Sequence, residues 1–432
     1  MRIYQNYHKH SNYTNVRIAD SAVTQKDYAE RALQLNRSIL SSCEHGWQGN
    51  YYETIKLAKQ AGLKPLVSSE AYWVRDRFEK DRTNCHIFIG AKNENGRQAL
   101  NDVLSEANIT GFYGQPRLDI PLILSLPKDD VIVTTACIGY WRYEDADLIT
   151  EQFAKHFGKN FFLEVQYHDT ESQRQLNKKI LQLHNELKIP LIMGCDSHFI
   201  YPEQAQIRTD FLYSKGLTYP EEEGWFLDYP DGDTAYERFA NQCVLSHEEI
   251  IDAMDNTNVF TEIEEYDSPI FNSEIKMPSI YPDLTQEQKD DIYQKLIWSG
   301  WNSYKNEVHE DQHEKYIEEI KKEVKTVLDT HTSDYFIINN KIMDVAKKNG
   351  GWLTKSGRGS GVSFITNKLL GFTEVDRVAA KVHMYPERFM STERILQSGS
   401  LPDIDFNCAN VDVFAEAQKE VLGDGHSYPL FA

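Results

Sequence analysis

Short apolar runs alternate with amphipathic stretches over roughly the first 200 residues of the chain. The apolar runs, which predict buried strands, are SILSS, KPLVSS, HIFIGA, VIVTTA, FFLEV and PLIMG. The stretches between them, such as TQKDYAERALQLN, NYYETIKLAKQAG and NGRQALNDVLSEAN, carry apolar residues at helical spacing. This alternation predicts a parallel α/β architecture, either covered by helices on both sheet faces or closed into a barrel.

The pattern breaks at residues 266–285, where YDSPIFNSEIKMPSIYPDLT holds three prolines and no sustained period. We place a domain boundary there, between residues 1–270 and 271–432. Beyond it, QEQKDDIYQKLIWSGWNSYKNE and EKYIEEIKKEVKTVL predict helices, and the Gly- and Ser-rich TKSGRGSGVS follows. The chain stops at SYPLFA without a polar tail, and we interpret this as a cut within a domain.

Composition narrows the class of protein. No run of eighteen apolar residues predicts a membrane span, and the N-terminus lacks the apolar region of a secretory signal. Six cysteines without a regular spacing favour a reducing cytoplasm over a disulfide framework. The net charge of −20 argues against a broad electrostatic grip on DNA, and residues 221–267 have Arg238 as their only basic side chain. Any contact with DNA must come from elsewhere in the chain.

Nearly every predicted strand delivers a side chain that can bind a metal. His8 and His10 are two apart, so in an extended segment they point to the same face. Singly, such residues are more often loop histidines, helix caps or small buried cysteines. Together at matching strand ends, where α/β folds gather their ligands, they predict a centre for more than one ion. The others are Asp20, Glu44, His45, Glu70, Cys137, Asp196 and His198; His86 stands apart because it starts its strand.

The order His-x-His, Asp, Glu-His-Gly, Glu, His, Cys, Asp-x-His resembles the PHP (polymerase and histidinol phosphatase) superfamily. It resembles most the N-terminal domain of the DNA polymerase III alpha family. The resemblance implies a distorted seven-stranded (β/α) barrel with up to three Zn, Mn or Fe ions, and 3′–5′ exonuclease or other phosphodiesterase activity. Two departures are Glu44, where the family usually has Asp, and the long spacing before Asp20. The implied ligands are His8, His10, Asp20, His45, Glu70, His86, Cys137, Asp196 and His198.

A second set of motifs follows the boundary. In GWLTKSGRGSGVSFITNKLLG, glycines precede an apolar run that predicts a helix, so backbone N–H groups and Arg358 could bind a phosphate. A plain turn before a helix is the alternative. In SLPDIDF, Asp403 and Asp405 lie at i and i+2 of a predicted strand, where both carboxylates could share Mg²⁺. A pair of surface aspartates is the alternative there.

Together, GRGSG…LLGFTEVD…YPERFMSTER…LPDIDF resembles the palm of the same polymerase family, a nucleotidyltransferase domain of the polymerase-beta type. The resemblance implies a partial α+β palm whose catalytic carboxylates, Asp403 and Asp405, hold Mg²⁺. Many relatives carry a third acidic residue where this chain has Asn407. The residues implied to bind the triphosphate of the incoming nucleotide are Gly357, Arg358, Gly359, Ser360, Ser363, Arg388 and Arg394.

The expectation is therefore a cytoplasmic N-terminal fragment of a replicative DNA-directed DNA polymerase. Its partners would be primer-template DNA, dNTPs and replisome subunits such as the sliding clamp. The fragment alone is not expected to polymerise, because thumb, fingers and the third catalytic aspartate would lie beyond it. Two alternatives are a free-standing phosphatase of a small phosphate monoester and a PHP domain that serves only as a structural or docking module. The second set of motifs disfavours the former, and metal analysis with a nuclease assay tests the latter.

Overall fold

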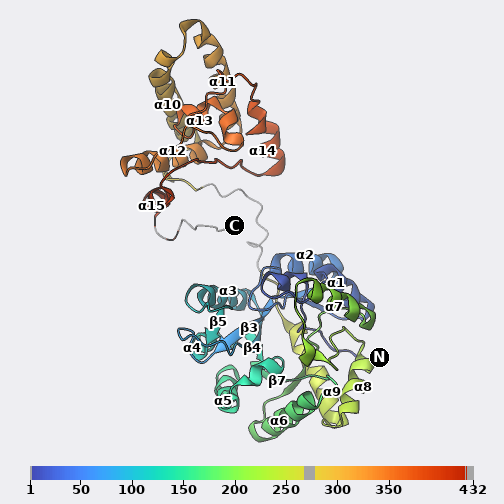
Figure 1. The fold of residues 1–432 in the computed structure, drawn as a ribbon. Helices are drawn as coiled ribbons and strands as arrows, with labels where there is room; N and C mark the ends of the chain where they lie inside the picture. Colours follow the sequence, from blue (N-terminus) through green and yellow to red (C-terminus); the bar gives the residue numbers. More distant parts are fainter. Residues whose placement is uncertain (1, 267–277, 424, 426–432) are drawn as a thin grey trace. The chain divides into compact units, whose positions relative to one another are not determined.

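A computed structural model describes residues 2–266, 278–423 and 425, and the chain divides into two compact units, residues 1–270 and 271–432 (Figure 1). Each unit has its own core of buried apolar side chains. Residues 267–277, most of the predicted boundary segment, lie outside the described residues. None of the described helices is long and apolar enough to cross a membrane.

The first unit is built on a six-stranded sheet of order β5–β3–β4–β6–β7–β8, accompanied by the parallel pair β1–β2. All six predicted apolar runs form strands, with KPLVSS supplying β2 and the start of β3. This confirms the predicted α/β class for the unit. The strands are β1 Ile39–Ser41, β2 Lys64–Leu66, β3 Ser68–Val74, β4 Cys85–Ala91, β5 Arg117–Asp119, β6 Val131–Thr134, β7 Phe161–Val165 and β8 Leu191–Met193.

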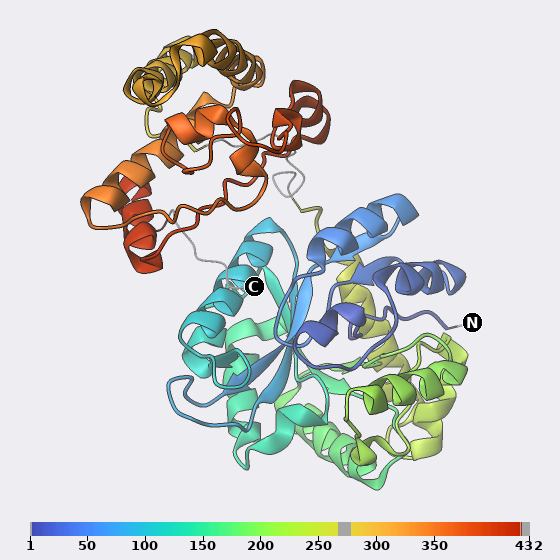
Figure 2. The same cartoon turned by 45° about the horizontal axis from the view of Figure 1, so that its top comes forward.

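Helices connect the strands and surround them (Figure 2). The three helices predicted between strands form α1, α2 and α3; α1 begins with a capping box made by Thr24 and Asp27, and α2 ends at Gly62 with φ +71°. The helices of this unit are α1 Gln25–Gln34, α2 Tyr51–Ala61, α3 Glu94–Ile109, α4 Ile120–Leu124, α5 Ala146–Phe157, α6 Glu171–Leu187, α7 Ala205–Ser214, α8 Gly232–Gln242 and α9 His247–Asp255.

Strand β4 corrects the prediction of a parallel sheet, because it runs antiparallel to both of its neighbours, β3 and β6. The segment between β3 and β4, residues 75–84, contains no helix. A parallel crossover needs a dozen or more residues and usually a helix, so this short link returns the chain as an antiparallel strand. Consequently β4 starts at the rim where its parallel neighbours end.

The sheet curls so that segments far apart in sequence meet. Lys9 forms a parallel bridge with Ser197 beyond β8, and His45 beyond β1 forms one with Glu70 in β3. The order of neighbouring segments around the barrel is therefore residues 5–10 (the first segment), β8, β7, β6, β4, β3 and β1. These seven segments are the strands of the distorted barrel, and their ends form one rim.

The second unit is helical in its described residues, 278–423. Its core includes Tyr293, Ile320, Phe336 and Phe389. The predicted helices form α10 and α11. The helices are α10 Gln286–Tyr304, α11 His313–Asp329, α12 Ser333–Lys348, α13 Ile365–Leu369, α14 Thr392–Ser398 and α15 Val411–Leu422.

The strand predicted at SLPDIDF does not form, so the expectation of a strand carrying Asp403 and Asp405 is wrong. Residues 401–407 are irregular, and an isolated antiparallel bridge joins Leu353 to Cys408. A strand requires a neighbour to satisfy its ladder of backbone groups, and residues 352–354 provide only a short one.

Candidate metal centre

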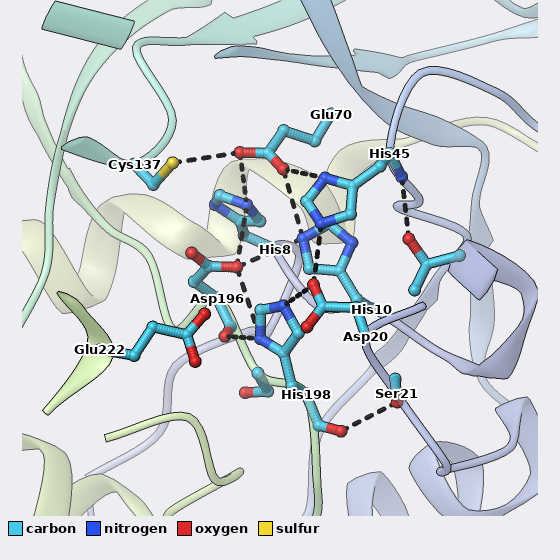
Figure 3. A network of polar contacts seen from close by, with 12 residues as sticks. His8, His10, Asp20, Ser21, His45, Glu70, Cys137, Asp196, His198 and Glu222 are labelled. Carbon is cyan, nitrogen blue, oxygen red and sulfur yellow. Dashed lines mark hydrogen bonds and ion pairs between the residues drawn. The ribbon is translucent and has the colours of Figure 1, made fainter. Parts of the chain in front are cut away.

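The rim of the barrel brings all nine predicted ligands of the first unit together. Figure 3 shows them except for His86. Eight of the nine residues are at most 6% exposed, and His86 is half-buried. His86 reaches the same rim because β4 is antiparallel, which resolves its apparent misplacement in the sequence. The convergence of the nine side chains is therefore a property of the strand topology.

A first group of donors comprises His8, His10, Glu70 and Asp196. Nε2 of His8 lies 3.3 Å from Oε1 of Glu70 and 3.5 Å from Oδ1 of Asp196. Nε2 of His10 lies 3.3 Å from Oε2 of Glu70 and 3.2 Å from the same Asp196 oxygen. Two imidazoles and two carboxylates thus face one point, which is a donor set suited to Zn, Mn or Fe.

A second group shares Glu70 with the first. Nδ1 of His86 lies 2.9 Å from Oε1 of Glu70 and 3.2 Å from Sγ of Cys137, which is itself 3.4 Å from that oxygen. Glu70 therefore belongs to both groups of donors. Ala136 precedes the cysteine with φ +50°, so the chain turns sharply where it presents the thiol.

A third group comprises Asp20, His45 and His198. Oδ2 of Asp20 lies 3.2 Å from Nε2 of His45 and 2.8 Å from Nε2 of His198. The long spacing between His10 and Asp20 is accommodated by a 3-10 turn, Asn12–Val16, so Asp20 still reaches the rim. Asp20 thus joins the cluster despite its long spacing from His10 in the sequence.

Many of these donor atoms are buried and lack a hydrogen-bond partner among the described residues. They are Nε2 of His8, both ring nitrogens of His10, Nδ1 of His45, Oε2 of Glu70 and Oδ1 of Asp196. Buried polar atoms are almost always paired, because an unpaired one loses its hydration without compensation. A divalent cation would satisfy these atoms, so the residues present fit such an ion.

The charges of the cluster support the same conclusion. Burial favours the neutral form of Glu70, but His86 and His8 outweigh this and hold the pKa of that carboxyl well below its usual range. Burial lowers the pKa of His10 to about 4, and nearby His45 adds to the effect. Burial also disfavours a charged His45, yet Asp20 and Glu70 raise its pKa to about 10. The buried carboxylates therefore require positive charge, which protons or bound cations can supply.

Glu164 contacts the donor cluster, and the sequence analysis missed it. It is 1% exposed, and its Oε1 accepts a hydrogen bond from Nδ1 of His8 at 2.7 Å. Tyr7 and Thr134 donate to its Oε2 at 2.7 and 3.0 Å. A carboxylate in this position fixes the His8 ring so that Nε2 faces the other donors. The available signal was a single charged residue inside the apolar run FFLEV.

Arg208 on α7 is a second missed residue. Its guanidinium contacts the Oδ1 atom of Asp20, donates to the Asp20 backbone oxygen at 2.8 Å and to Oε2 of Glu222 at 2.5 Å. Asp20 therefore presents one oxygen to Arg208 and the other to His45 and His198. Nothing near Arg208 in the sequence predicts this pairing, because α7 reaches the site only through the fold.

Glu44 has no place in the cluster. Its side chain accepts hydrogen bonds from the backbone N–H of Ser11 at 3.1 Å and from Nδ2 of Asn50 at 2.6 Å. Burial raises the pKa of Glu44 to about 7 despite the neighbouring Lys9. Glu44 thus joins the loop after β1 to the first segment, and its difference from the usual family Asp leaves the nine donors intact.

A cavity of about 400 Å³ opens over the donors. Asp20, His45, His86, Cys137, Asp196 and His198 lie along its wall, and Tyr72, Arg142 and Trp225 are among its other lining residues. A volume of this size is within the range of small-molecule sites. The cluster is therefore accessible to a ligand although its members are buried.

In the second unit, the loop around Gly359 and the segment around Asp405, two parts of the predicted nucleotide site, lie next to each other. A Cβ on Gly359 would lie 1.7 Å from Oδ2 of Asp405, so only glycine allows the loop to approach this carboxylate. Arg358 Nε lies 3.8 Å from Asp405 Oδ1, and Asn407 donates to the backbone oxygen of Ser356 at 3.0 Å. The Gly- and Ser-rich loop and the Asp-containing segment are thus adjacent.

The remaining predicted residues of this unit are more scattered. Three of them are exposed: Gly357, Arg358 and Asp403. Ser360 is half-buried, and Ser363 is buried at 4% exposure. Arg388 and Arg394 are exposed and joined by a 3.5 Å hydrogen bond from Arg394 to the Arg388 carbonyl. The triphosphate-binding roles of these residues stay predictions.

Two family models match the chain. The model of the PHP domain matches residues 6–168, and that of the "Bacterial DNA polymerase III alpha NTPase domain" matches residues 284–423. Among solved structures, a putative metal-dependent phosphoesterase from Bifidobacterium adolescentis aligns with 56% of this chain and 97% of its own, at 14% identity and a TM-score of 0.29. That similarity is too low to support an argument about the fold.

Curated relatives match across both units. DNA polymerase III subunit alpha of Borreliella burgdorferi is 26% identical over 430 residues, which cover 96% of this chain and 35% of the relative. The subunits of Campylobacter jejuni and Aquifex aeolicus are each 24% identical, covering 98% and 95% of this chain and 37% and 36% of their own. The chain spans little more than a third of the length of these relatives. The chain thus carries a match to the PHP domain followed by a match to the bacterial DNA polymerase III alpha NTPase domain, and it is similar over both units to the N-terminal part of DNA polymerase III alpha subunits.

Proposed function

We propose that the first unit is a metal-dependent phosphodiesterase that removes nucleotides from the 3′ end of DNA. The observation that carries this proposal is the convergence of nine donors, several of whose buried atoms have no hydrogen-bond partner in the described part of the chain. Divalent ions bound there would lower the pKa of a coordinated water and neutralise charge on phosphate oxygens. Zn, Mn and Fe all suit the mixed imidazole, carboxylate and thiolate donors.

The protein's own residues prepare the site for this reaction. Glu164 holds His8 in one orientation, and Glu70 is shared between the first two donor groups. Arg208 holds Asp20 at the rim. The low exposure of the donors keeps competing water away from them, which strengthens their electrostatic effect on a bound phosphate.

Metal analysis combined with a nuclease assay tests the proposal. The purified chain should contain Zn, Mn or Fe and should shorten a 3′-terminated DNA strand, and His8→Ala/His10→Ala should abolish both metal content and hydrolysis. A matched control is His309→Ala/His383→Ala, which removes two exposed histidines of the second unit. Full hydrolysis by the His8/His10 variant, or a metal-free protein from metal-supplemented growth, would contradict the proposal.

The two alternatives give different outcomes in the same experiment. A phosphatase of a small phosphate monoester would release phosphate from a monoester and leave DNA intact. A structural module would retain metal without hydrolysing either substrate.

For the second unit we propose a part of a nucleotidyltransferase palm, in which Asp403 and Asp405 hold Mg²⁺ and the Gly357–Ser360 loop binds the nucleotide triphosphate. The contact of Gly359 with Asp405 supports this assignment. In the complete protein the substrates would be primer-template DNA and dNTPs. The protein would act in the cytoplasm, with replisome subunits such as the sliding clamp as partners.

Calorimetric titration of the chain with a dNTP and Mg²⁺ tests the assignment of this nucleotide site. Binding should weaken in Asp405→Asn, and equal binding by the wild type and the variant would contradict the assignment.

A further inference from the structure

Tyr72 lines the cavity above the metal donors without being one of them. It lies on β3 two residues after Glu70, so both side chains project from the same face of the strand. Across the sheet it pairs with His86, and the two ring centroids are 5.2 Å apart in an edge-to-face arrangement. Its ring also stacks at 6.2 Å on His45. Tyr72 therefore lies beside donors of the second and third groups.

The position of the Tyr72 ring is fixed by its neighbours. A Cβ on Gly46 would lie 2.9 Å from two carbons of the ring, and Gly46 has φ +68°, so glycine both makes the turn after His45 and leaves room for the phenol. The Tyr72 side chain is 2% exposed. A ring held in this way presents its hydroxyl in one direction.

The Tyr72 hydroxyl is buried and has no hydrogen-bond partner among the described residues. Three other buried tyrosines around the barrel do have one: Tyr7 donates to Glu164 at 2.7 Å, Tyr28 to the Ser197 carbonyl at 2.8 Å, and Tyr140 shares a bond with Thr150 at 3.0 Å. The buried Tyr167 hydroxyl also lacks a partner among the described residues, but Tyr167 does not line the cavity. Phenylalanine would fill the same space without burying an unpaired hydroxyl. An O–H group in this position fits an acceptor that arrives with a ligand.

We propose that the Tyr72 hydroxyl donates a hydrogen bond to a phosphoryl oxygen of the bound substrate. This inference rests on the proposed phosphodiesterase function and adds a substrate-binding residue to it. The cavity of about 400 Å³ accommodates a phosphate ester together with part of the group attached to it. A phosphoryl oxygen is the acceptor that a ligand of this site would bring, and hydrogen bonds to charged oxygens are stronger than neutral ones.

Titration calorimetry of the metal-loaded full chain with inorganic phosphate tests the proposal. Tyr72→Phe should bind phosphate about 10- to 100-fold more weakly, as expected for the loss of one hydrogen bond to a charged group. Its metal content and its thermal unfolding midpoint should equal those of the wild type, because the hydroxyl has no hydrogen-bond partner in the part of the protein that the structure describes. Tyr140→Phe is the matched control, since it removes a buried hydroxyl that is bonded to Thr150, and it should keep the wild-type phosphate affinity.

The outcomes separate this inference from the function on which it rests. Wild-type protein that binds metal but neither binds phosphate nor cleaves DNA overturns both. Wild-type protein that does both, with a Tyr72→Phe variant of equal phosphate affinity, overturns the role of Tyr72 alone. A Tyr72→Phe variant that loses metal or fails to fold also overturns it, because the hydroxyl would then support the protein itself.

Discussion

Two buried carboxylates of the metal centre in the first unit and one buried carboxylate of the second unit have opposite surroundings. In the first unit, Glu70 and Asp196 are buried, and one oxygen of each lacks a hydrogen-bond partner among the described residues while it faces other donors. In the second unit, the buried Glu323 on α11 is saturated: Ile365 N, Thr366 N and Thr366 Oγ1 donate to it at 2.8–2.9 Å, and Arg377 pairs with it. The unsatisfied atoms of Glu70 and Asp196 indicate a ligand site, whereas the partners of Glu323 balance its charge within the fold.

The candidate metal centre of the first unit and the candidate nucleotide site of the second also differ in how firmly their residues are held. The nine donors of the first unit are held in place by a barrel rim and by neighbours such as Glu164. The loop around Arg358 and the segment around Asp405 are exposed or half-buried and depend on few contacts. The first site is therefore organised before any ligand binds, while the second would gain much of its order from the nucleotide.

The largest effect is expected from breaking the saturated carboxylate of the second unit. Glu323→Gln leaves the buried Arg377 with a poorer partner and weakens the cap on α13, so the second unit should lose about 3–5 kcal/mol of unfolding free energy. Chemical denaturation followed by tryptophan fluorescence measures the loss. Glu319→Gln is the control, because Glu319 also bonds Arg377, at 2.8 Å, but is more exposed and should cost under about 1 kcal/mol.

Chelation should affect only the first unit. Removing an ion present at about 1,000 times its dissociation constant costs about 4 kcal/mol, which lowers the unfolding midpoint of a unit of this size by roughly 10 °C. Differential scanning calorimetry before and after chelation should show one transition moving and the other fixed. Equal movement of both transitions would contradict the assignment of metal binding to the first unit.

A substitution of Glu164, which accepts the hydrogen bond from His8, should have an intermediate effect on metal affinity. Glu164→Gln keeps the shape but weakens the acceptor of the His8 Nδ1 hydrogen bond, so metal affinity should fall about 10- to 100-fold. Competition with a chromogenic chelator measures this change. Glu203→Gln, at an exposed position of the same unit, should leave the affinity unchanged, and an equal loss there would show that the effect is not local.

The smallest effect is expected at the exposed loop of the second unit. The Arg358 side chain is 70% exposed and lies 3.8 Å from Asp405, so Arg358→Ala should change the unfolding free energy by less than about 0.5 kcal/mol. Binding of a dNTP with Mg²⁺ should nevertheless weaken measurably. A large loss of stability would show that the loop is organised in advance, which would remove the contrast between the two sites.

The sequence by itself determined most strands and helices of the first unit and indicated which of its side chains are candidate metal donors. Apolar runs such as FFLEV and PLIMG become strands because the period of their apolar residues matches a buried strand, and TQKDYAERALQLN becomes α1 because its period matches a helix. The nine donors could be identified by their order along the chain. The strand at SLPDIDF was predicted wrongly. Two aspartates at i and i+2 are compatible with a strand, but a strand forms only where a neighbouring strand pairs with it.

The tertiary structure alone decided which of these residues meet. The antiparallel direction of β4 brings His86 to the rim, and α7 brings Arg208 to Asp20 across 188 positions of the sequence. The roles of Glu164 and Tyr72 likewise follow from which strand lies next to which. Local period is a property of neighbouring residues and can be read from the chain, whereas strand direction and pairing depend on contacts between distant segments, which only the folded barrel creates.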